Sequence, residues 1–236
     1  MICASLVAET METALEKMTT GFRHADLLEL RIDLIADLDL PVLLKGKTGP
    51  VLITNRRREE GGGFRGTEEE RIVLLCEAIH LKAEYVDIEA ATDDGLARQV
   101  LGAAAGQGCH TKIIVSFHDF SATPTAGALR RIWGSCRERG GDIVKIVTHA
   151  RHSEDNLRVL SLIPYSRKKG QDIIAFCMGE QGRISRIMAP LLGSHLTFAS
   201  LDKGEEAAPG QMTVEEMKQI MRLLACREPD RAENGK

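Results

Sequence analysis

The 236-residue sequence has few aromatic residues and no long apolar run. Aromatic residues make up 4% of the chain, and no stripe of Lys and Arg interleaves with them, so a surface that stacks and binds nucleic-acid bases is not expected. No apolar run approaches the roughly 20 residues that a helix needs to span a bilayer, and the first residues lack the basic region of a signal peptide. These absences predict a cytoplasmic protein whose partner is neither nucleic acid nor a membrane.

The cysteines are not arranged as a metal site or a disulfide framework. They are scattered, with no C-x-x-C pair, at Cys3, Cys76, Cys109, Cys136, Cys177 and Cys226. This spacing predicts free thiols in a reducing cytosol and no bound metal. Because no nicotinamide-binding motif is evident either, we expect no cofactor.

What the chain does contain is a repeated unit, in which a short β-branched run is followed by an amphipathic helical pattern. Helical patterns at 67–82 and 213–225 each follow a capping box, Thr67 with Glu70 and Thr213 with Glu216. The runs recur at intervals of about 22–35 residues, the size of one βα unit. The eight predicted strands are 2–8, 27–33, 50–55, 84–90, 112–119, 142–149, 172–178 and 196–201.

This alternation predicts a parallel sheet of the α/β class. Eight units in a chain of this length favour a closed (β/α)8 barrel, the TIM barrel, over an open doubly wound sheet. No G-x-G-x-x-G follows the first strand, which also speaks against the open sheet. Since no linker-like tract divides the chain, we expect a single domain over residues 1–228 and a frayed tail at 229–236.

Charged side chains occupy strand positions that a purely structural barrel would fill with Val, Ile and Leu. Lys145 lies in the middle of the strand "DIVKIVTHA", where burying an ammonium group costs several kcal/mol unless it is paired or neutralised. His118 is in phase with Ser116 on the preceding strand. Other polar residues lie late in strands or just after them: Glu29, Arg31, Asp33, Arg56, Arg57, Arg58, Glu59, Glu60, Asp87, Glu89, Arg186 and Gln211.

Each of these residues taken alone has a simple structural explanation. Glu29 and Arg31 could form an ion pair at the barrel mouth. The carboxylates of the fourth strand could accept hydrogen bonds from neighbouring Lys or Arg. His118 could be a satisfied half-buried histidine, and Lys145 could extend to the barrel rim. The active sites of such barrels lie at the carboxyl ends of the strands, so the whole set predicts a common cavity there.

The set suits imine chemistry. A lysine ammonium that is desolvated and surrounded by arginines loses its proton more easily, and the neutral amine of Lys145 can then attack a ketone. The protonated imine acidifies the adjacent C–H, and His118 can take that proton and return it. Arginines favour an anionic substrate such as a carboxylate or a phosphate.

Seven stretches of the sequence resemble type I 3-dehydroquinate dehydratase, the enzyme of the shikimate pathway that forms a Schiff base. They are "ELRID", "TNRRREEGG", "YVDIEA", "SFHDF", "DIVKI", "MGEQGRISR" and "APGQM", they occur in family order, and they span nearly the whole chain. The resemblance implies a (β/α)8 barrel that converts 3-dehydroquinate into 3-dehydroshikimate and water by syn elimination.

The resemblance also implies a role for individual residues. Lys145 would form the imine, His118 would be the general acid and base, and Glu60 would orient His118. Arg186 would bind the substrate carboxylate. The resemblance implies seven further residues that bind the substrate or line its pocket: Ser5, Glu29, Arg31, Arg56, Met178, Phe198 and Gln211. Gln211 lies on a loop that closes over the ligand in this family.

Two departures from the family pattern stand out. Many relatives carry a Ser four residues before the loop Gln, where this chain has Ala207, so one hydrogen bond to the substrate could be missing. Some relatives begin with a β-hairpin that covers the base of the barrel. Here the first strand begins near residue 2, so we expect other residues to close the base. The resemblance further implies a homodimer.

Two other functions stay open at this point. One is a different Schiff-base barrel, of the class I aldolase or transaldolase kind, in which the loops after the seventh and eighth strands bind phosphate. The acidic residues Asp202, Glu205 and Glu206 in the last of these loops would repel phosphate. The other is a barrel that binds carboxylates without catalysis, for which the Lys145 and His118 pair would have no use.

Overall fold

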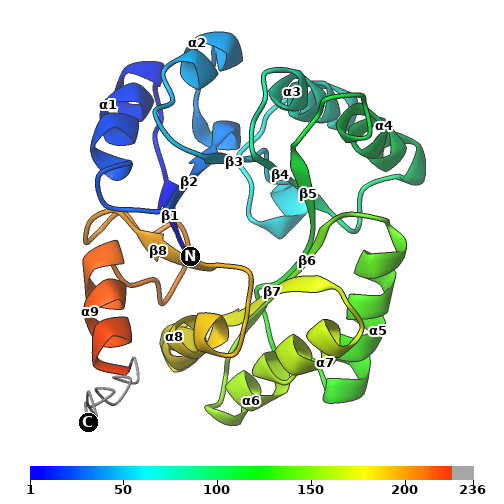
Figure 1. Ribbon diagram of the computed structural model, residues 1–236, viewed down its shortest axis with the longest axis vertical. Coiled ribbons are helices and arrows are strands. Elements are labelled where there is room, and N and C mark those ends of the chain that lie inside the picture. The colour runs from blue at the N-terminus through cyan, green and yellow to red at the C-terminus, as the bar shows by residue number, and fades with distance from the viewer. Residues whose placement is uncertain (225–236) are drawn as a thin grey trace, which may run out of the picture.

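The computed structural model describes residues 1–224, in which parallel strands lie at the centre and helices surround them (Figure 1). The strands are β1 Ile2–Leu6, β2 Leu27–Arg31, β3 Val51–Thr54, β4 Tyr85–Glu89, β5 Lys112–Asp119, β6 Ile143–His149, β7 Asp172–Met178 and β8 Thr197–Ser200. The α-helices are α1 Met11–Gly21, α2 Leu40–Lys45, α3 Glu68–His80, α4 Asp94–Ala104, α5 Ala126–Glu138, α6 Glu154–Leu160, α7 Leu162–Lys168, α8 Arg183–Leu191 and α9 Val214–Leu224. The predicted tail at 229–236 lies outside the described residues.

The strands form one parallel sheet in the order β7-β6-β5-β4-β3-β2-β1-β8. Strand β1 pairs with both β2 and β8, so that Cys3 lies opposite Leu27 on one side and Phe198 on the other. Within residues 1–224 no strand ladder joins β7 to β8, but the His195 N–H donates to the Ile173 carbonyl across this seam, at 2.8 Å. The chain is therefore a nearly closed (β/α)8 barrel, as predicted, and the open doubly wound sheet is wrong.

All eight predicted strands are present, and most differ from their expected bounds by one or two residues. The difference that matters most for the site is at the end of the second strand, which was expected to run to residue 33. Here β2 stops at Arg31, and a 3-10 turn, η1, follows at Ile32–Leu34. Both predicted capping boxes are confirmed: the Thr67 and Thr213 hydroxyls accept from the N–H groups of Glu70 and Glu216, each at 3.2 Å.

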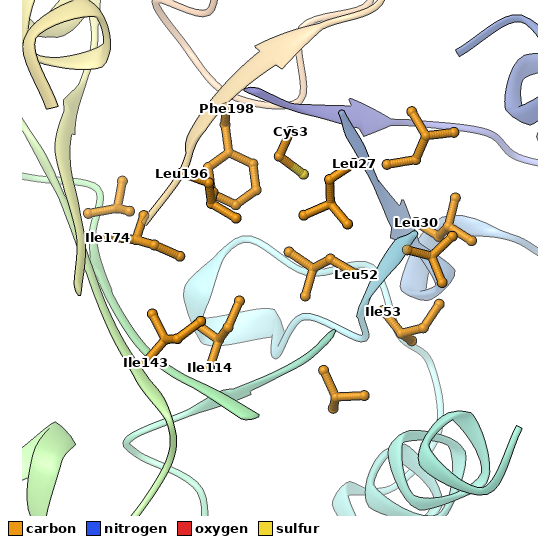
Figure 2. Close-up of a cluster of buried hydrophobic side chains, with 14 of the residues drawn as sticks. Cys3, Leu27, Leu30, Leu52, Ile53, Ile114, Ile143, Ile174, Leu196 and Phe198 are labelled. Carbon is orange, nitrogen blue, oxygen red and sulfur yellow. The ribbon is translucent and has the colours of Figure 1, made fainter. Parts of the chain in front are cut away.

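Apolar side chains fill the amino-terminal half of the barrel interior. Figure 2 shows seven of them in the space that the sheet surrounds, from six strands and the residue before β8: Cys3, Leu27, Leu52, Ile114, Ile143, Ile174 and Leu196. These residues are buried. Successive residues of a strand point to opposite faces, so the residue two positions further along each strand points into the same interior. At five of the seven places the residue two positions further along is polar: Ser5, Glu29, Thr54, Ser116 and Lys145.

The base of the barrel is closed by a contact between opposite sides of the sheet. Tyr85, the first residue of β4, is hydrogen-bonded through its hydroxyl to His195 Nε2, at 3.2 Å. The two rings meet edge to face, with centroids 5.8 Å apart. His195 Nδ1 lies 3.4 Å from Asp172 Oδ2, at the start of β7. A ring pair therefore covers the base, where the sequence led us to expect a substitute for the hairpin.

Replacing Tyr85 by Phe removes only the hydroxyl of this contact and leaves the ring pair in place. We expect the free energy of unfolding to fall by about 1 kcal/mol, because His195 Nε2 loses its partner while half-buried. Urea unfolding followed by circular dichroism measures this loss. The control is Tyr165→Phe, since the Tyr165 hydroxyl bonds to no other residue within 1–224; equal loss in both variants would contradict the assignment.

Candidate active site

A pocket opens at the carboxyl end of the strands, where the barrel interior changes from apolar to charged. It encloses about 540 Å³ of space, part of it open to solvent. All eleven residues that the resemblance implied line it: Ser5, Glu29, Arg31, Arg56, Glu60, His118, Lys145, Met178, Arg186, Phe198 and Gln211. The remaining lining residues are Gly61, Phe120, Val147, Phe176, Ala207 and Ala208. Side chains from seven strands or their following loops thus meet in one place.

Glu29 is held by hydroxyl groups and not by Arg31. The Ser5 and Thr54 hydroxyls donate to its two carboxylate oxygens, at 2.7 and 2.8 Å. Arg31 donates through Nε and Nη2 to Asp33, at 2.8 and 2.7 Å. The simple explanation that Glu29 and Arg31 form an ion pair is therefore wrong, because the turn after β2 brings Asp33 back onto Arg31.

Lys145 lies in the middle of β6 and is 3% exposed, so it does not extend to the rim. Its ammonium group donates to Asp87 Oδ2, at 2.8 Å, and lies 3.9 Å from Glu29 Oε1. It also lies 4.4 Å from the centre of the Phe198 ring. The sequence led us to expect arginines around Lys145, but carboxylates lie beside it, and Arg56 is linked to it through the Asp87 that they share.

Arg56 joins the carboxylates of β4. Its Nη1 donates to Asp87 Oδ1, at 2.8 Å, to Glu89 Oε1, at 2.7 Å, and to the Ser116 hydroxyl oxygen, at 2.9 Å. The Ser116 hydroxyl in turn donates to Asp87 Oδ1, at 2.6 Å. Burial acts to raise the pKa of Asp87, but the charges of Arg56 and Lys145 outweigh it and hold that pKa well below its usual range. Asp87 therefore stays ionised, and it can hold both Arg56 and Lys145.

His118 and Glu60 form a partly buried pair, with His118 on β5, between β4 and β6. His118 Nδ1 lies 2.8 Å from Glu60 Oε2, which also accepts from the His118 backbone N–H, at 3.1 Å. Burial, followed by the charges of Arg56 and Lys145, places the pKa of His118 well below its ordinary value. Burial, with the charge of Glu89 next, raises the pKa of Glu60 to about 7. The imidazole is thus neutral near pH 7 and its Nε2 is free for proton transfer.

Arg186 is a buried cation without a carboxylate partner among residues 1–224. It is 1% exposed, in the first turn of α8. Its guanidinium lies over the Phe176 ring, 4.6 Å from the centre, and donates weakly to the carbonyls of Phe198 and Pro209, at 3.5 and 3.3 Å. Burial lowers the pKa of Arg186 to about 10. An unpaired buried guanidinium on a pocket wall is a receptor for a carboxylate or another anion.

The loop after β8 covers the pocket. Gln211 is buried, its amide donates to the Ser5 hydroxyl oxygen, at 3.3 Å, and its oxygen accepts from the Ala207 N–H, at 2.7 Å. The loop meets the loop after β7, where the Gly179 N–H donates to the Pro209 carbonyl, at 3.0 Å. Ala207, where the family pattern has a Ser, lines the pocket. The loop that carries it still packs on the loop after β7.

Some residues of the site were not assigned a role from the sequence. Asp87 was expected only to accept hydrogen bonds from a neighbouring Lys or Arg. It does so from Arg56 and from Lys145, and the second contact makes it part of the site. Phe120 stacks on His118, with ring centres 6.3 Å apart, and Phe176 carries Arg186. Phe120 follows a predicted site residue closely in the sequence, and Phe176 lies on the strand that ends at Met178, which were the only signals available for them.

Within residues 1–224 no cluster of three or more His, Cys, Asp or Glu is arranged to hold a metal ion, and no helix is long and apolar enough to cross a membrane. The barrel and its carboxyl-end pocket, with a strand lysine and a neutral histidine, define the molecule as a (β/α)8-barrel enzyme. The family model of type I 3-dehydroquinase matches residues 2–227. The chain belongs to this family.

Proteins of known name agree with this assignment. A 3-dehydroquinate dehydratase of Thermococcus gammatolerans is 40% identical over 95% of this chain and 99% of its own length. One from Desulfotalea psychrophila is 38% identical over 93% of this chain and 96% of its own length. Among solved structures, the Aquifex aeolicus 3-dehydroquinate dehydratase is 29% identical, with a TM-score of 0.77 over 96% of this chain and all of that one. That of Clostridium difficile, 24% identical, matches the fold with a TM-score of 0.84 over 94% of this chain and 91% of its own.

Replacing Gly210 by Ala should loosen the loop over the pocket. Gly210 has a φ of +77°, and a Cβ atom there would lie 2.3 Å from the Gly179 carbonyl oxygen. A left-handed conformation costs a residue with a side chain about 1–2 kcal/mol, and the clash adds to this. We expect trypsin to cut after the exposed Lys203 roughly 5- to 30-fold faster, in proportion to the opening of the loop.

The matched control for this variant is Gly170→Ala. Gly170 has a φ of +69°, but nothing lies within 4 Å of its added Cβ, so the strain is similar without the contact between loops. It lies between α7 and β7, away from Lys203. Equal cleavage of the Gly210 variant and the wild type would show that the loop does not depend on this approach.

Proposed function

We propose that the protein is a 3-dehydroquinate dehydratase that removes water from 3-dehydroquinate through an imine on Lys145, and that 3-dehydroshikimate is the product. The observation that carries the proposal is the geometry of the pocket. One wall presents a lysine amine, another presents a neutral histidine, and a third presents an arginine whose charge has no partner among residues 1–224. A cyclic hydroxyketone that bears a carboxylate uses all three.

The first step is addition of the Lys145 amine to the substrate ketone. The ammonium must first give up its proton, and neutral His118 on the pocket wall is the acceptor suited to this. The nitrogen then bonds to the carbonyl carbon. The oxygen takes one proton from this nitrogen and the one that His118 had accepted, and it leaves as water, so that His118 is neutral again for the next step. Asp87 remains ionised and balances the positive charge of the protonated imine that results.

The second step is the elimination. His118 Nε2 takes a proton from C2, next to the imine carbon, and the electron pair moves toward the imine nitrogen as an enamine. The same His118 then donates its proton to the hydroxyl at C1, which leaves as water as the enamine returns to an imine. Hydrolysis of this imine restores the Lys145 amine and releases the ketone. Glu60 keeps the His118 proton on Nδ1, so that Nε2 faces the substrate.

Substrate binding divides between the two halves of the pocket. Arg186 binds the carboxylate, with Gln211 closing over it. Glu29 and Arg31 bind ring hydroxyls on the charged side, and Arg56 binds the polar rim of the substrate there. Ser5 orients Glu29 and contacts Gln211, while Met178 and Phe198 provide an apolar surface against the ring. The proposed reaction is the third step of the shikimate pathway, which leads to the aromatic amino acids. A cytoplasmic location and a homodimer stay predictions, the first from the sequence and the second from the resemblance.

Borohydride trapping tests the imine. Borohydride delivers hydride to the C=N carbon and converts the imine into a stable secondary amine. After treatment with 3-dehydroquinate and borohydride, we expect peptide mass spectrometry to find the ligand mass on Lys145. Lys145→Met should take up no label, whereas Lys112→Gln, which changes an exposed lysine of β5, should label like the wild type. Label on another residue, or none, refutes the proposal.

The pH dependence of kcat/KM tests the Glu60–His118 pair. Ionised Glu60 accepts the Nδ1 proton and leaves Nε2 as the base, whereas protonated Glu60 donates to Nδ1 and leaves the proton on Nε2. Because burial raises the pKa of Glu60 to about 7, kcat/KM should rise with pH through an apparent pKa near 7 that belongs to the pair.

The variant Glu60→Gln separates the two groups. The amide oxygen of the introduced glutamine accepts from Nδ1 at any pH, so the limb near pH 7 should disappear. The remaining acid limb should lie below pH 6.5, because the pKa of His118 is lowered by burial and by neighbouring cations. If kcat/KM of Glu60→Gln still shows a limb near pH 7, that limb belongs to a group other than Glu60.

A further inference from the structure

Arg71 lies outside the pocket, yet it contacts the groups that hold the pocket together. It is in the first turn of α3 and is 1% exposed. Cations are favoured near the carboxyl end of a helix, and the amino-terminal turn is the unfavourable end for one. A buried arginine at this end needs compensating contacts. Besides Glu68 on its own helix, its partners come from β4 and from the segments that follow β3 and β4, which carry residues of the site.

We propose that Arg71 is a positioning residue for the dehydration: it holds Glu89 and the segment after β3, and through them it orients Arg56, Asp87, Lys145 and Glu60. The inference rests on the proposed function, since it concerns the same reaction.

The contacts of Arg71 use all sides of its guanidinium. Nε and Nη2 donate to the two oxygens of Glu68, each at 2.8 Å, which fixes the plane of the group. Nη2 also donates to the Thr92 hydroxyl oxygen, at 3.1 Å, and Nη1 donates to the Asn55 carbonyl, at 2.7 Å. Nη1 lies 2.9 Å from Glu89 Oε2. A planar fork with five N–H groups can do this, and a lysine cannot.

The first route into the site passes through Glu89. This carboxylate is 2% exposed, and its two oxygens face different arginines. Oε2 faces Arg71, and Oε1 accepts from Arg56 Nη1, at 2.7 Å. The same Arg56 nitrogen holds Asp87, and Asp87 holds Lys145. Glu89 Oε2 has no hydrogen-bond donor among residues 1–224, so the charge of Arg71 holds it as an ion pair. Through Glu89, Arg71 is connected to Arg56, Asp87 and Lys145.

The second route passes along the chain. The Asn55 carbonyl that Arg71 holds belongs to the residue before Arg56. The N–H of Arg57 donates to Glu89 Oε1, at 3.1 Å. This segment continues to Glu60, which is bonded to His118. Arg71 therefore fixes the start of the segment that carries Glu60, and the position of Glu60 depends on where that segment begins.

The charge of Arg71 should affect the pH dependence of kcat/KM, which a residue with a merely structural role would not change. After burial, the negative charge of Glu89 is the next cause that raises the pKa of Glu60. Arg71 Nη1 lies 2.9 Å from Glu89 Oε2, so we expect its positive charge to reduce that effect. Without it, ionised Glu60 is less favoured, and the limb of kcat/KM that belongs to the Glu60–His118 pair moves to higher pH.

The test compares Arg71→Gln, Arg71→Lys and a matched control with the full-length wild-type protein. A displacement of about 1 Å in a reacting group can reduce the rate by about 100-fold, so we expect kcat of Arg71→Gln to fall at least about tenfold. KM should rise by a smaller factor than kcat falls, because Arg186, which binds the carboxylate, is untouched and, of the proposed binding residues, only Arg56 lies in the series that Arg71 orients. The limb near pH 7 should move upward. Arg71→Lys restores the charge but not the fork, so it should restore the pH limb while kcat stays low.

The control is Arg158→Gln on α6. Arg158 pairs with Asp155 three residues earlier in its helix, as Arg71 pairs with Glu68, but it lies away from the pocket. It should leave kcat, KM and the pH profile unchanged. Circular dichroism confirms that each variant is folded. If Arg71→Gln does not fold, Glu68→Gln decides: Glu68 is partly exposed, and losing half of its clamp should lower kcat by a smaller factor in the same direction.

The outcomes separate this inference from the proposed function. A wild-type protein that does not dehydrate 3-dehydroquinate refutes the proposed function. An active wild type together with a folded Arg71→Gln of unchanged kcat and pH profile refutes only the role of Arg71. A variant whose KM rises while kcat is unchanged also refutes it, since that result describes a binding residue. A Glu68→Gln variant with wild-type kcat has the same meaning where Arg71→Gln is unfolded.

Discussion

The ion pair between Lys145 and Asp87 lies inside the barrel, where the two residues are 3% and 1% exposed. Burying a charge is costly unless the charge is paired, and a carboxylate has two oxygens that can accept from more than one cation. Asp87 therefore also accepts from Arg56, and Arg56 holds Glu89. Glu89 faces Arg71, and Arg71 is clamped by Glu68, whose side chain is 31% exposed. Glu68 Oε1 in turn lies 3.7 Å from Arg57 Nε, so the series of alternating charges continues to residues that solvent reaches.

The pocket has two chemically different halves because the barrel is not uniform around its axis. Strands β1 to β6 and their loops supply hydroxyl groups, carboxylates and cations on one side of the interior, whereas β7 and β8 supply Phe176 and Phe198. The two rings lie 5.8 Å apart beside the seam that lacks a ladder. Arg186 lies at this seam, and its burial against aromatic faces explains why its charge remains available to a ligand.

The barrel and the pocket were predictable from the sequence because both follow from periodic patterns. Strand spacing determines the fold, and the carboxyl ends of parallel strands converge, so the polar residues late in the strands had to meet. Contacts that depend on a local change of direction were not predictable in this way. Arg31 pairs with Asp33 because the chain turns after β2. The partner of Lys145 depends on which side chains reach across the barrel, and Arg71 reads in the sequence as one more charged residue of an amphipathic helix.

The closure of the barrel by β1 and β8 has a consequence for how the protein is made. Ser5 and Gln211, which touch in the pocket, are 206 residues apart in the chain. As the chain leaves the ribosome, Lys145 and its charged partners emerge well before β8 and the loop that follows it. Because β8 pairs with β1, the sheet is open at that edge until the last strand arrives, and water reaches these charges from that side until then. The last part of translation thus decides when the buried charges leave solvent, and a chain that stops short of β8 has no pocket.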